Sequence, residues 1–283
     1  MTRAPNDGII LVNVLVALAL GAALVVLMFT SQDNLIDRSR RAAAASQAEA
    51  LALGGEASIV AALARDMVEA ADTDNLTEDW AAIQQEAVEL ATGTFSVQVA
   101  DAQALFDVNQ LQDGGLLQAQ TLAILVAQAG LPASVGQSIA AQIRADGPVA
   151  DLDALRNLDA ETRAVLGDRL VALPVPGDVN LNTAPLPVLT AVLGNAATAT
   201  RLLSLRDRQG FVTPADLAGL GGIAATGVGF TSDVFDITVT AGVDDTTVAL
   251  VSRVLRLHRT PAEREVRVIS RRIMAPEPEV PAQ

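Results

Sequence analysis

The sequence contains no cysteine, no tyrosine and no lysine, since all 19 of its basic residues are arginine, and its single histidine is His258. Without cysteine there is no thiol nucleophile, disulfide or thiolate zinc site, and without lysine there is no P-loop lysine or Schiff base. One imidazole cannot supply a typical catalytic zinc site, and no G-x-S-x-G sequence accompanies it, so we interpret His258 as structural or solvated. We therefore predict no catalytic residue and no enzyme activity.

Aromatic residues make up only 2% of the 283 residues, whereas 51% are hydrophobic, so the core must be built from alanine, leucine, valine and isoleucine. The 33 acidic residues outnumber the 19 arginines and give a net charge of −14. Nucleic-acid backbones and anionic membrane surfaces attract proteins of the opposite charge. General affinity for either is therefore not expected, and no nucleic-acid partner is predicted.

A long apolar run, IILVNVLVALALGAALVVLMF, occupies residues 9–29 and is interrupted only by Asn13. At 1.5 Å per helical residue it reaches roughly 30 Å, the thickness of the hydrocarbon core of a bilayer. A secretory signal would be shorter and would be cleaved after small residues, for which Ala17 and Ala19 offer a site. Because the apolar residues continue to Phe29, we predict a transmembrane helix at 9–30.

A short polar leader, MTRAPNDG, precedes this run and ends in Gly8. It resembles the class III signal of type IV pilins and pseudopilins, which prepilin peptidase cuts after the glycine. The resemblance implies a leader at 1–8, cleavage between Gly8 and Ile9, and N-methylation of Ile9. Most such proteins carry glutamate at the fifth mature position, which is Asn13 here. The tip pseudopilin K of type II secretion is the member of the family that lacks this glutamate.

The distribution of arginine predicts a membrane topology opposite to the one that the leader resemblance implies. Only Arg3 and the terminal amine precede the apolar run, whereas Arg38, Arg40 and Arg41 follow it. A count of positive charges would place the C-terminal side in the cytoplasm. The leader resemblance instead implies a single-pass protein of the bacterial inner membrane with its globular part in the periplasm.

Beyond the apolar run, residues 31–71 are rich in helix formers, and apolar residues recur there at helical spacing, so one long helix continues from the membrane segment. The Gly54–Gly55 pair is a candidate bend. The acidic stretch 72–79 has turn formers but lacks EF-hand spacing, which favours a solvated loop over a cation site. Alternating apolar and polar residues predict four strands, at 94–100, 234–240, 246–257 and 265–271. The Pro-rich acidic tail 275–283 is predicted to be disordered.

Residues 112–230 contain helical runs broken by glycine and proline, and we interpret them as a helical insertion. A weak repeat at an offset of 62 residues aligns Asp151 with Thr213 as helix N-caps, and Val149 with Phe211. The insertion resembles helix-hairpin-helix modules, with Gly221 and Gly222 in a candidate hairpin. DNA-binding versions of that module present a basic surface, whereas this insertion is acidic, so we favour a structural role.

Two further motifs indicate one family. Residues 101–109, DAQALFDVN, resemble the D-E-x-G-x-x-x-x-N motif of the type II secretion minor pseudopilin K (GspK) family, and 179–185, VNLNTAP, resemble its V-N-x-N-T-A-P run. Ala102 and Ala104 depart from the first pattern. The predicted fold class is α+β, a pilin-like long N-terminal helix plus antiparallel sheet with a large inserted all-α domain. Its predicted parts are the pseudopilin helix and sheet at 31–111 and 231–274, and the insertion at 112–230.

The family resemblance implies a protein at the tip of the pseudopilus that helps initiate and cap assembly for protein export. The implied partners are minor pseudopilins I and J, other pseudopilus subunits, prepilin peptidase and the membrane. No metal or other cofactor is predicted, although calcium is left open with no ligands assigned. The alternatives are a membrane-anchored helix-hairpin-helix protein for DNA binding or DNA uptake, and an exported enzyme, for which we find no catalytic constellation.

Overall fold

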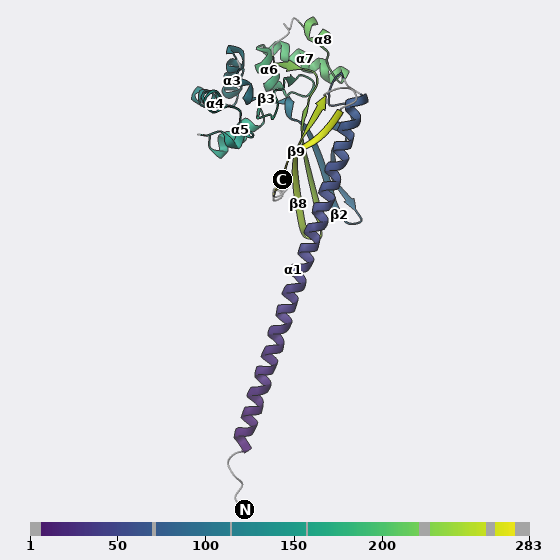
Figure 1. The fold of residues 1–283 in the computed structure, drawn as a ribbon, viewed down its shortest axis with the longest axis vertical. Helices are drawn as coiled ribbons and strands as arrows, with labels where there is room; N and C mark the ends of the chain where they lie inside the picture. The colour runs from purple at the N-terminus through teal and green to yellow at the C-terminus, as the bar shows by residue number, and fades with distance from the viewer. Residues whose placement is uncertain are drawn as a thin grey trace, which may run out of the picture.

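The computed structural model describes residues 7–69, 72–113, 115–156, 158–220, 227–258 and 264–274. Helix α1 (Asp7–Glu69) is one continuous helix of 63 residues that extends far below the rest of the molecule (Figure 1). Every residue from Leu11 to Ala43 is exposed. The apolar part is long and hydrophobic enough to cross a membrane, with a mean hydropathy of 2.7. Its length and position indicate a single-pass membrane anchor.

The upper part of α1 packs against a five-stranded antiparallel sheet of order β1-β2-β7-β8-β9 (Figure 1). The strands are β1 (Gln85–Leu90), β2 (Gly93–Asp101), β7 (Val234–Val243), β8 (Thr246–His258) and β9 (Arg264–Met274). Four of these strands were predicted from alternation. The edge strand β1 was not, because its sequence QEAVEL carries two acids and lacks a regular alternating pattern.

Small side chains let α1 approach the sheet closely. Ala44, Ala48 and Ala52 are buried in the core together with Phe235, Val239 and their neighbours. A Cβ added to Gly55 would lie 2.5 Å from the ring of Phe95, so this glycine provides room for packing. The helix continues through Gly54–Gly55 without interruption.

The segment between β2 and β7 forms a second core beside the upper end of the sheet (Figure 1). Its helices are α3 (Leu116–Gln128), α4 (Ala133–Asp146), α5 (Ala160–Gly167), α6 (Leu186–Leu193), α7 (Ala196–Gln209) and α8 (Pro214–Gly219). The short helix α2 (Asp79–Ala82) precedes the sheet. The insertion also contains strand pieces: β3 (Phe106–Asp107) pairs in parallel with β4 (Leu170–Val171), and β5 (Val179–Asn180) with β6 (Val228–Gly229).

The insertion consists of two similar units, which we call the first repeat (106–171) and the second repeat (179–229). Each begins and ends with one strand of a parallel pair. Helices α4 and α7 both have 14 residues and lie 63 positions apart in the sequence. Each is followed by a glycine with positive φ, Gly147 at 87° and Gly210 at 91°.

The N-caps at Asp151 and Thr213 agree with the sequence analysis. Upstream of these caps, however, equivalent positions in the two repeats are 63 residues apart and not the predicted 62. Asp151 caps a 3-10 turn, η3 (Leu152–Ala154), and Thr213 forms a capping box with Asp216 at α8. Because the helices are 63 residues apart and the caps 62, Val149 corresponds to the buried Val212 and not to Phe211. Residues 221–223 of the candidate hairpin, the leader up to residue 6, the tail 275–283 and the side chain of His258 lie outside the described residues.

Candidate functional site

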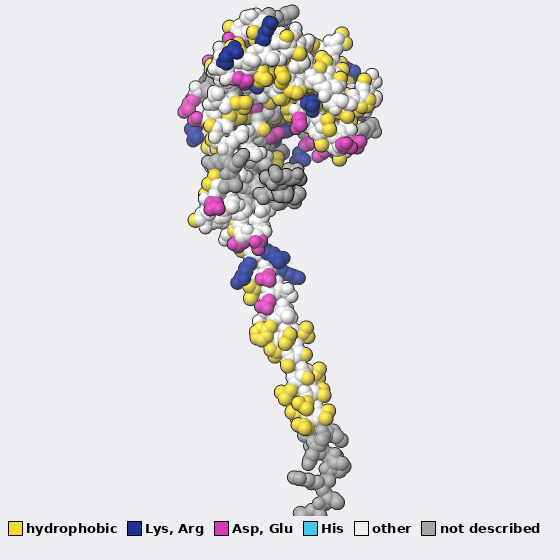
Figure 2. All heavy atoms as spheres, turned by 180° about the vertical axis from the view of Figure 1, so that it is seen from behind, with side chains coloured by type: hydrophobic (Ala, Val, Ile, Leu, Met, Phe, Trp, Pro, Cys, Tyr) yellow, Lys and Arg dark blue, Asp and Glu magenta, His cyan; other side chains and the backbone are white. Residues whose placement is uncertain are grey.

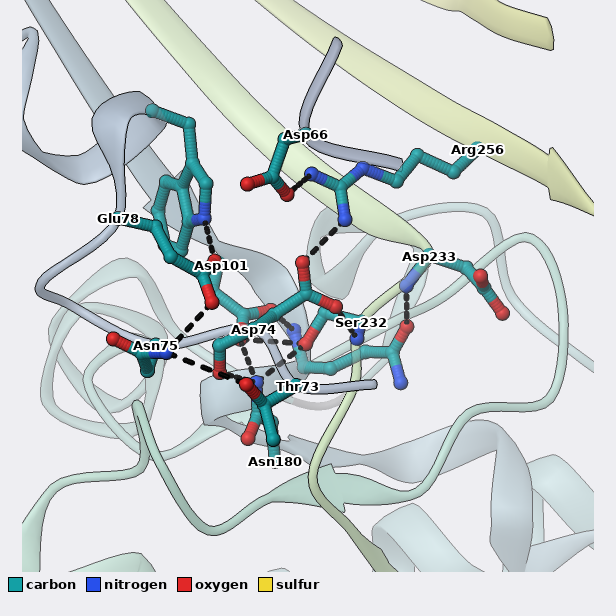
Figure 3. A network of polar contacts seen from close by, with 12 residues as sticks. Asp66, Thr73, Asp74, Asn75, Glu78, Asp101, Asn180, Ser232, Asp233 and Arg256 are labelled. Atoms are coloured by element: carbon teal, nitrogen blue, oxygen red, sulfur yellow. Dashed lines mark hydrogen bonds and ion pairs between the residues drawn. The ribbon is translucent and has the colours of Figure 1, made fainter. Parts of the chain in front are cut away.

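The two family motifs meet at a buried polar junction between the insertion and the sheet (Figure 3). Asp101, the last residue of β2, accepts a hydrogen bond from the backbone N–H of Gln103 through one oxygen, at 2.8 Å. Its other oxygen accepts three, from Thr183 Oγ1 at 2.5 Å, Ser232 Oγ at 2.6 Å and Asn180 Nδ2 at 3.0 Å. Burial raises the pKa of Asp101 to about 6 even though the Ser232 and Thr183 hydroxyls favour its ionised form.

Asp74 joins this group to the end of α1. Its carboxylate accepts from the backbone N–H of Ser232 at 2.6 Å and contacts the Arg256 guanidinium, and its carbonyl oxygen accepts from Asn180 Nδ2 at 3.0 Å. Arg256 also pairs with Asp66, on the last turns of α1, at 2.6 Å. The side chains of Asp66, Asp74 and Arg256 are each at most 6% exposed. The predicted solvated loop at 72–79 is therefore wrong for Asp74, which is buried and pairs with Arg256 of β8.

An aromatic ring covers the Arg256 guanidinium. The Arg256 guanidinium carbon lies 4.5 Å from the centre of the Phe235 ring, which itself contacts Trp80 edge to face at 5.0 Å. The indole N–H of Trp80 donates to Glu78 at 2.7 Å, and Asn75 Nδ2 donates to the same carboxylate at 2.6 Å. Burial raises the pKa of Glu78 to about 7. The junction is therefore largely buried and rich in carboxylates.

Three of these carboxylates are close enough to hold a metal ion. Oxygens of Asp66, Asp74 and Glu78 lie within 4.8 Å of one another, and oxygen ligands suit hard cations such as calcium. However, the Arg256 guanidinium already contacts Asp66 and Asp74, and Glu78 accepts from Trp80 and Asn75. The arrangement is thus a carboxylate cluster with an internal cation, and no metal is required to explain its geometry.

Each repeat contains the same polar turn, which begins at the last residue of its first strand. In the first repeat, Asp107 accepts from the N–H of Asn109, whose side-chain oxygen accepts from Val149 N–H at 2.8 Å. In the second, Asn180 accepts from the N–H of Asn182, whose side-chain oxygen accepts from Val212 N–H at 2.7 Å. Asn109, the last residue of the first motif, therefore holds the loop that follows α4. Asn182, the second asparagine of the second motif, holds the loop that follows α7 in the same way.

The first motif also braces the loops around an open cleft of about 580 Å³ beside the junction. Gln103 donates to the carbonyl of Asp178 at 2.9 Å and accepts from the N–H of Asp233 at 2.6 Å. Gln110 donates to the carbonyl of Gly177 at 2.6 Å. Because the side-chain amides of Gln103 and Gln110 line the cleft and hydrogen-bond to backbone groups, they stabilise its wall.

The residues predicted for processing lie at the opposite end of the molecule. Gly8 and Ile9 fall in the first turn of α1, which begins at Asp7, two residues before the predicted start. Asn13 is exposed on the same helix. The structure brings none of these residues to the junction, and cleavage, methylation and the role of Asn13 stay predictions.

Sequence reasoning did not identify Asp66, Asp74, Ser232 or Arg256. A signal existed in β8, where Arg256 shares the inward face with the apolar Val254 and Leu250 and with Ser252. An arginine on a strand face that is otherwise buried requires an acidic partner. The partners could not be identified from the sequence, because Asp66 and Asp74 lie more than 180 residues away.

Comparison with known proteins agrees with this architecture. Residues 179–238, which include the second motif, match the family described as type II secretion system (T2SS), protein K. The fold is similar to a chain in the crystal structure of the GspK-GspI-GspJ complex from the enterotoxigenic Escherichia coli type 2 secretion system. The TM-score is 0.65 at 18% identity, over 84% of this chain and 100% of that one.

These matches support a minor pseudopilin K of type II secretion. The α+β fold class is thereby confirmed, and the matches support the resemblance inferred from the motifs and a minor pseudopilin role. No curated protein sequence matches the chain significantly. The matched family is a structural component of a secretion system.

Proposed function

We propose that this minor pseudopilin occupies the tip of the pseudopilus, where it joins minor pseudopilins I and J to initiate and cap assembly for protein export. Its anchor would lie in the bacterial inner membrane and its globular part in the periplasm. The GspK-GspI-GspJ complex, to which the fold is similar, supports I and J as partners. Exposure of α1 from Leu11 to Ala43 leaves a long helix for packing beside other membrane helices.

The observation that carries the proposal is the position of the insertion. It lies beside the end of the sheet farthest from the N-terminus (Figure 1), and Asn180 attaches it through hydrogen bonds to the carbonyl of Asp74 and the carboxylate of Asp101 in β2. A rigid mass of this kind would obstruct the addition of another subunit above it. Subunits could still add below, along the exposed part of α1.

Removal of residues 112–230, with the sheet kept intact, tests this proposal. The expected result in cells that assemble pseudopili is longer or less regular filaments, with binding to I and J retained as a check that the sheet has folded. Unchanged length and number of pseudopili would contradict the capping role. Loss of binding to I and J would show instead that the deletion disrupted the sheet.

We further propose that prepilin peptidase cuts between Gly8 and Ile9 and that Ile9 becomes N-methylated. Intact mass and N-terminal sequence of the protein extracted from membranes with prepilin peptidase present test this directly. A start after Ala19 would indicate an ordinary secreted protein. An intact Met1 would indicate a simple anchor.

Asn13 would suit a tip subunit. The fifth-position carboxylate of other pseudopilins is thought to pair with the terminal amine of the subunit ahead, and a tip subunit has none ahead. An unpaired carboxylate in lipid is costly, whereas asparagine carries no charge. Asn13→Glu should therefore reduce incorporation at the tip. Equal incorporation of both proteins would remove this rationale.

The proposed function needs neither catalysis nor a cofactor. Its requirements are an anchor, a rigid insertion and a surface for I and J. If the chain acts only by assembly, a purified GspK-like complex should form equally well with a calcium chelator and with calcium added. A strict calcium requirement would assign a metal to the complex.

A further inference from the structure

Three exposed arginines, Arg38, Arg40 and Arg41, lie close together on α1 between its apolar part and the sheet. Figure 2 shows basic side chains gathered on the helix directly below the globular part. The chain as a whole has a net charge of −14, so this group opposes the overall charge. Within the part of the chain that the structure describes, none of the three forms an ion pair. All three are therefore available to a partner.

The height of these arginines places them in water. Arg38 and Arg41 lie 9 and 12 residues beyond Phe29, where the apolar run ends. At 1.5 Å per helical residue they are roughly 13 and 18 Å above the edge of the hydrocarbon core. The headgroup layer on each side of a bilayer is roughly 5–8 Å thick. The arginines are therefore between the bilayer and the sheet, above the headgroups.

The arginines occupy one side of the helix, which we call the basic face. Successive residues of a helix are turned by about 100°, so Arg38, Arg40 and Arg41 span an arc of about 160°. The middle of this arc is aligned with Ala44 and Ala48, which are buried against the sheet. The basic face is thus the downward continuation of the face that the sheet covers. Because lipid surrounds a helix on all sides, whereas a neighbouring protein lies on one, this arrangement favours a protein partner.

The same side of α1 continues into the apolar run with small side chains. Ala19, Ala23 and Thr30 lie on it and are exposed. Small residues at helical spacing allow a second helix to approach closely in lipid. Asp33 and Asp37 also lie on this side, nearer the membrane than the arginines. Since the order of charges along a helix sets its partner and register, the acids below and arginines above define a complementary neighbour.

We propose that the basic face is a docking site for a second membrane-anchored helix, which carries carboxylates at the level of Arg38, Arg40 and Arg41. From Phe29 to Ala44, the first buried residue of α1, the open length is about 22 Å, or four helical turns. A helix about 10–12 Å wide fits beside α1 over this length, beneath the sheet. In the proposed assembly it belongs to minor pseudopilin I or J, so this inference rests on the proposed function.

Replacement of all three arginines of the basic face by glutamine tests the proposal. Affinity for purified full-length I and J is measured in detergent, for the wild type and for this triple variant. The affinity for one of the two should fall roughly tenfold, as three partly solvated ion pairs imply. Raising the salt to 1 M should weaken wild-type binding similarly and leave the triple variant unaffected. The matched control removes the same charge from exposed arginines of the insertion, through Arg144→Gln, Arg201→Gln and Arg208→Gln, and should bind like the wild type.

Cross-linking then locates the partner helix. Because the chain has no cysteine, Thr30→Cys and Gln32→Cys each provide a single attachment site for a photoreactive benzophenone maleimide. Thr30 lies on the side of the basic face, whereas Gln32 lies almost opposite at nearly the same height. The subunit whose binding depends on the arginines should be captured at least fivefold more from position 30 than from position 32. Equal capture from both positions would overturn the docking site.

The affinities separate this inference from the function on which it rests. Equal binding of I and J by the wild type and the triple variant would overturn the docking site and leave the proposed function intact. If neither subunit bound the wild type, both would fail. An equal loss in the control variant would overturn the docking site by reducing the effect to overall charge. Unchanged binding, together with a lost preference for spin-labelled phosphatidylglycerol over phosphatidylcholine in nanodiscs, would assign the arginines to lipid instead.

Discussion

The two repeats of the insertion share a fold and a polar turn, but their turns are connected to different surroundings. In the first repeat, Asp107 and Asn109 bind Val149, Leu173 and each other, so their contacts stay within the insertion. In the second repeat, Asn180 also donates to Asp74, Asp101 and Ser232, outside the insertion. The first turn therefore stabilises its own unit, and the second attaches that unit to the sheet.

The chemical difference is one atom of the side chain: Asp107 has a carboxylate oxygen where Asn180 has an amide nitrogen. A carboxylate at position 107 can only accept hydrogen bonds while ionised, whereas the amide at position 180 both accepts and donates. The amide can thus accept from Asn182 and at the same time reach the acidic junction, to which a carboxylate would add a further negative charge. The same turn attaches its unit to the sheet where it carries the amide of Asn180, and not where it carries the carboxylate of Asp107.

The largest difference should appear when the two β8 arginines that lie beside the repeats, Arg256 and Arg253, are removed in turn. Arg256→Met leaves Asp66 and Asp74 buried without a cation and should reduce the free energy of unfolding by about 3–5 kcal/mol. Arg253→Met should cost about 1–2 kcal/mol, because its partner Asp236 is 31% exposed and can be solvated. Arg253 supports the end of the first repeat through the carbonyl of Ala172. Denaturant unfolding of the full-length protein in detergent measures both, and equal losses would contradict the comparison.

Alanine substitution at the two turns should rank differently in the two repeats. Asn180→Ala removes a side chain with four hydrogen-bond partners and should cost about 3 kcal/mol, whereas Asn182→Ala removes one and should cost about 1 kcal/mol. In the first repeat Asn109→Ala should cost more than Asp107→Ala, since Asn109 also donates to Val149 and Leu173. The same unfolding measurement gives all four values. A common order in both repeats would show that the turns are equivalent after all.

The first repeat should respond to pH through Asp107. Burial raises the pKa of Asp107 to about 6, above the value near 4 of an unfolded chain. The folded state therefore holds the proton more tightly, and stability declines as pH rises from about 4 to 6 and then levels off. The loss should be on the order of 2 kcal/mol, and Asp107→Asn should remove it. Unfolding curves at pH 4.5 and pH 7 compare the two proteins, and an unchanged pH slope in Asp107→Asn would exclude this source.

The smallest difference should appear at the glycines that end α4 and α7. Both have positive φ, so alanine at either position should cost about 1 kcal/mol from backbone strain. A Cβ at Gly147 meets open space, whereas one at Gly210 lies 3.1 Å from the side chain of Thr77. Gly210→Ala should therefore lower the melting temperature more than Gly147→Ala. A larger decrease in Gly147→Ala would show that Gly210 is not tightly packed against Thr77 of the segment 72–79.

Much of the fold could be predicted from local patterns. The apolar run, the alternation in four strands and the caps at Asp151 and Thr213 are local signals, and each element formed. The motifs predicted the importance of Asp101 and Asn180 without their partners. Those partners depend on how distant segments meet. Ser232 and Asp101 are 131 residues apart in the sequence. A loop residue such as Asp74 is predicted to be solvated from the sequence, because its contact with Arg256 is formed only in the folded protein.

The long helix also determines how force would pass through the molecule. Two buried acids of α1, Glu56 and Asp66, lie ten residues apart, about 15 Å along its axis. Glu56 pairs with Arg271 of β9 and contacts Ser252, while Asp66 pairs with Arg256 of β8. A push along the helix axis would therefore shear both ion pairs at once, and neither could be peeled away alone. The sheet and the insertion would move with the helix as one body.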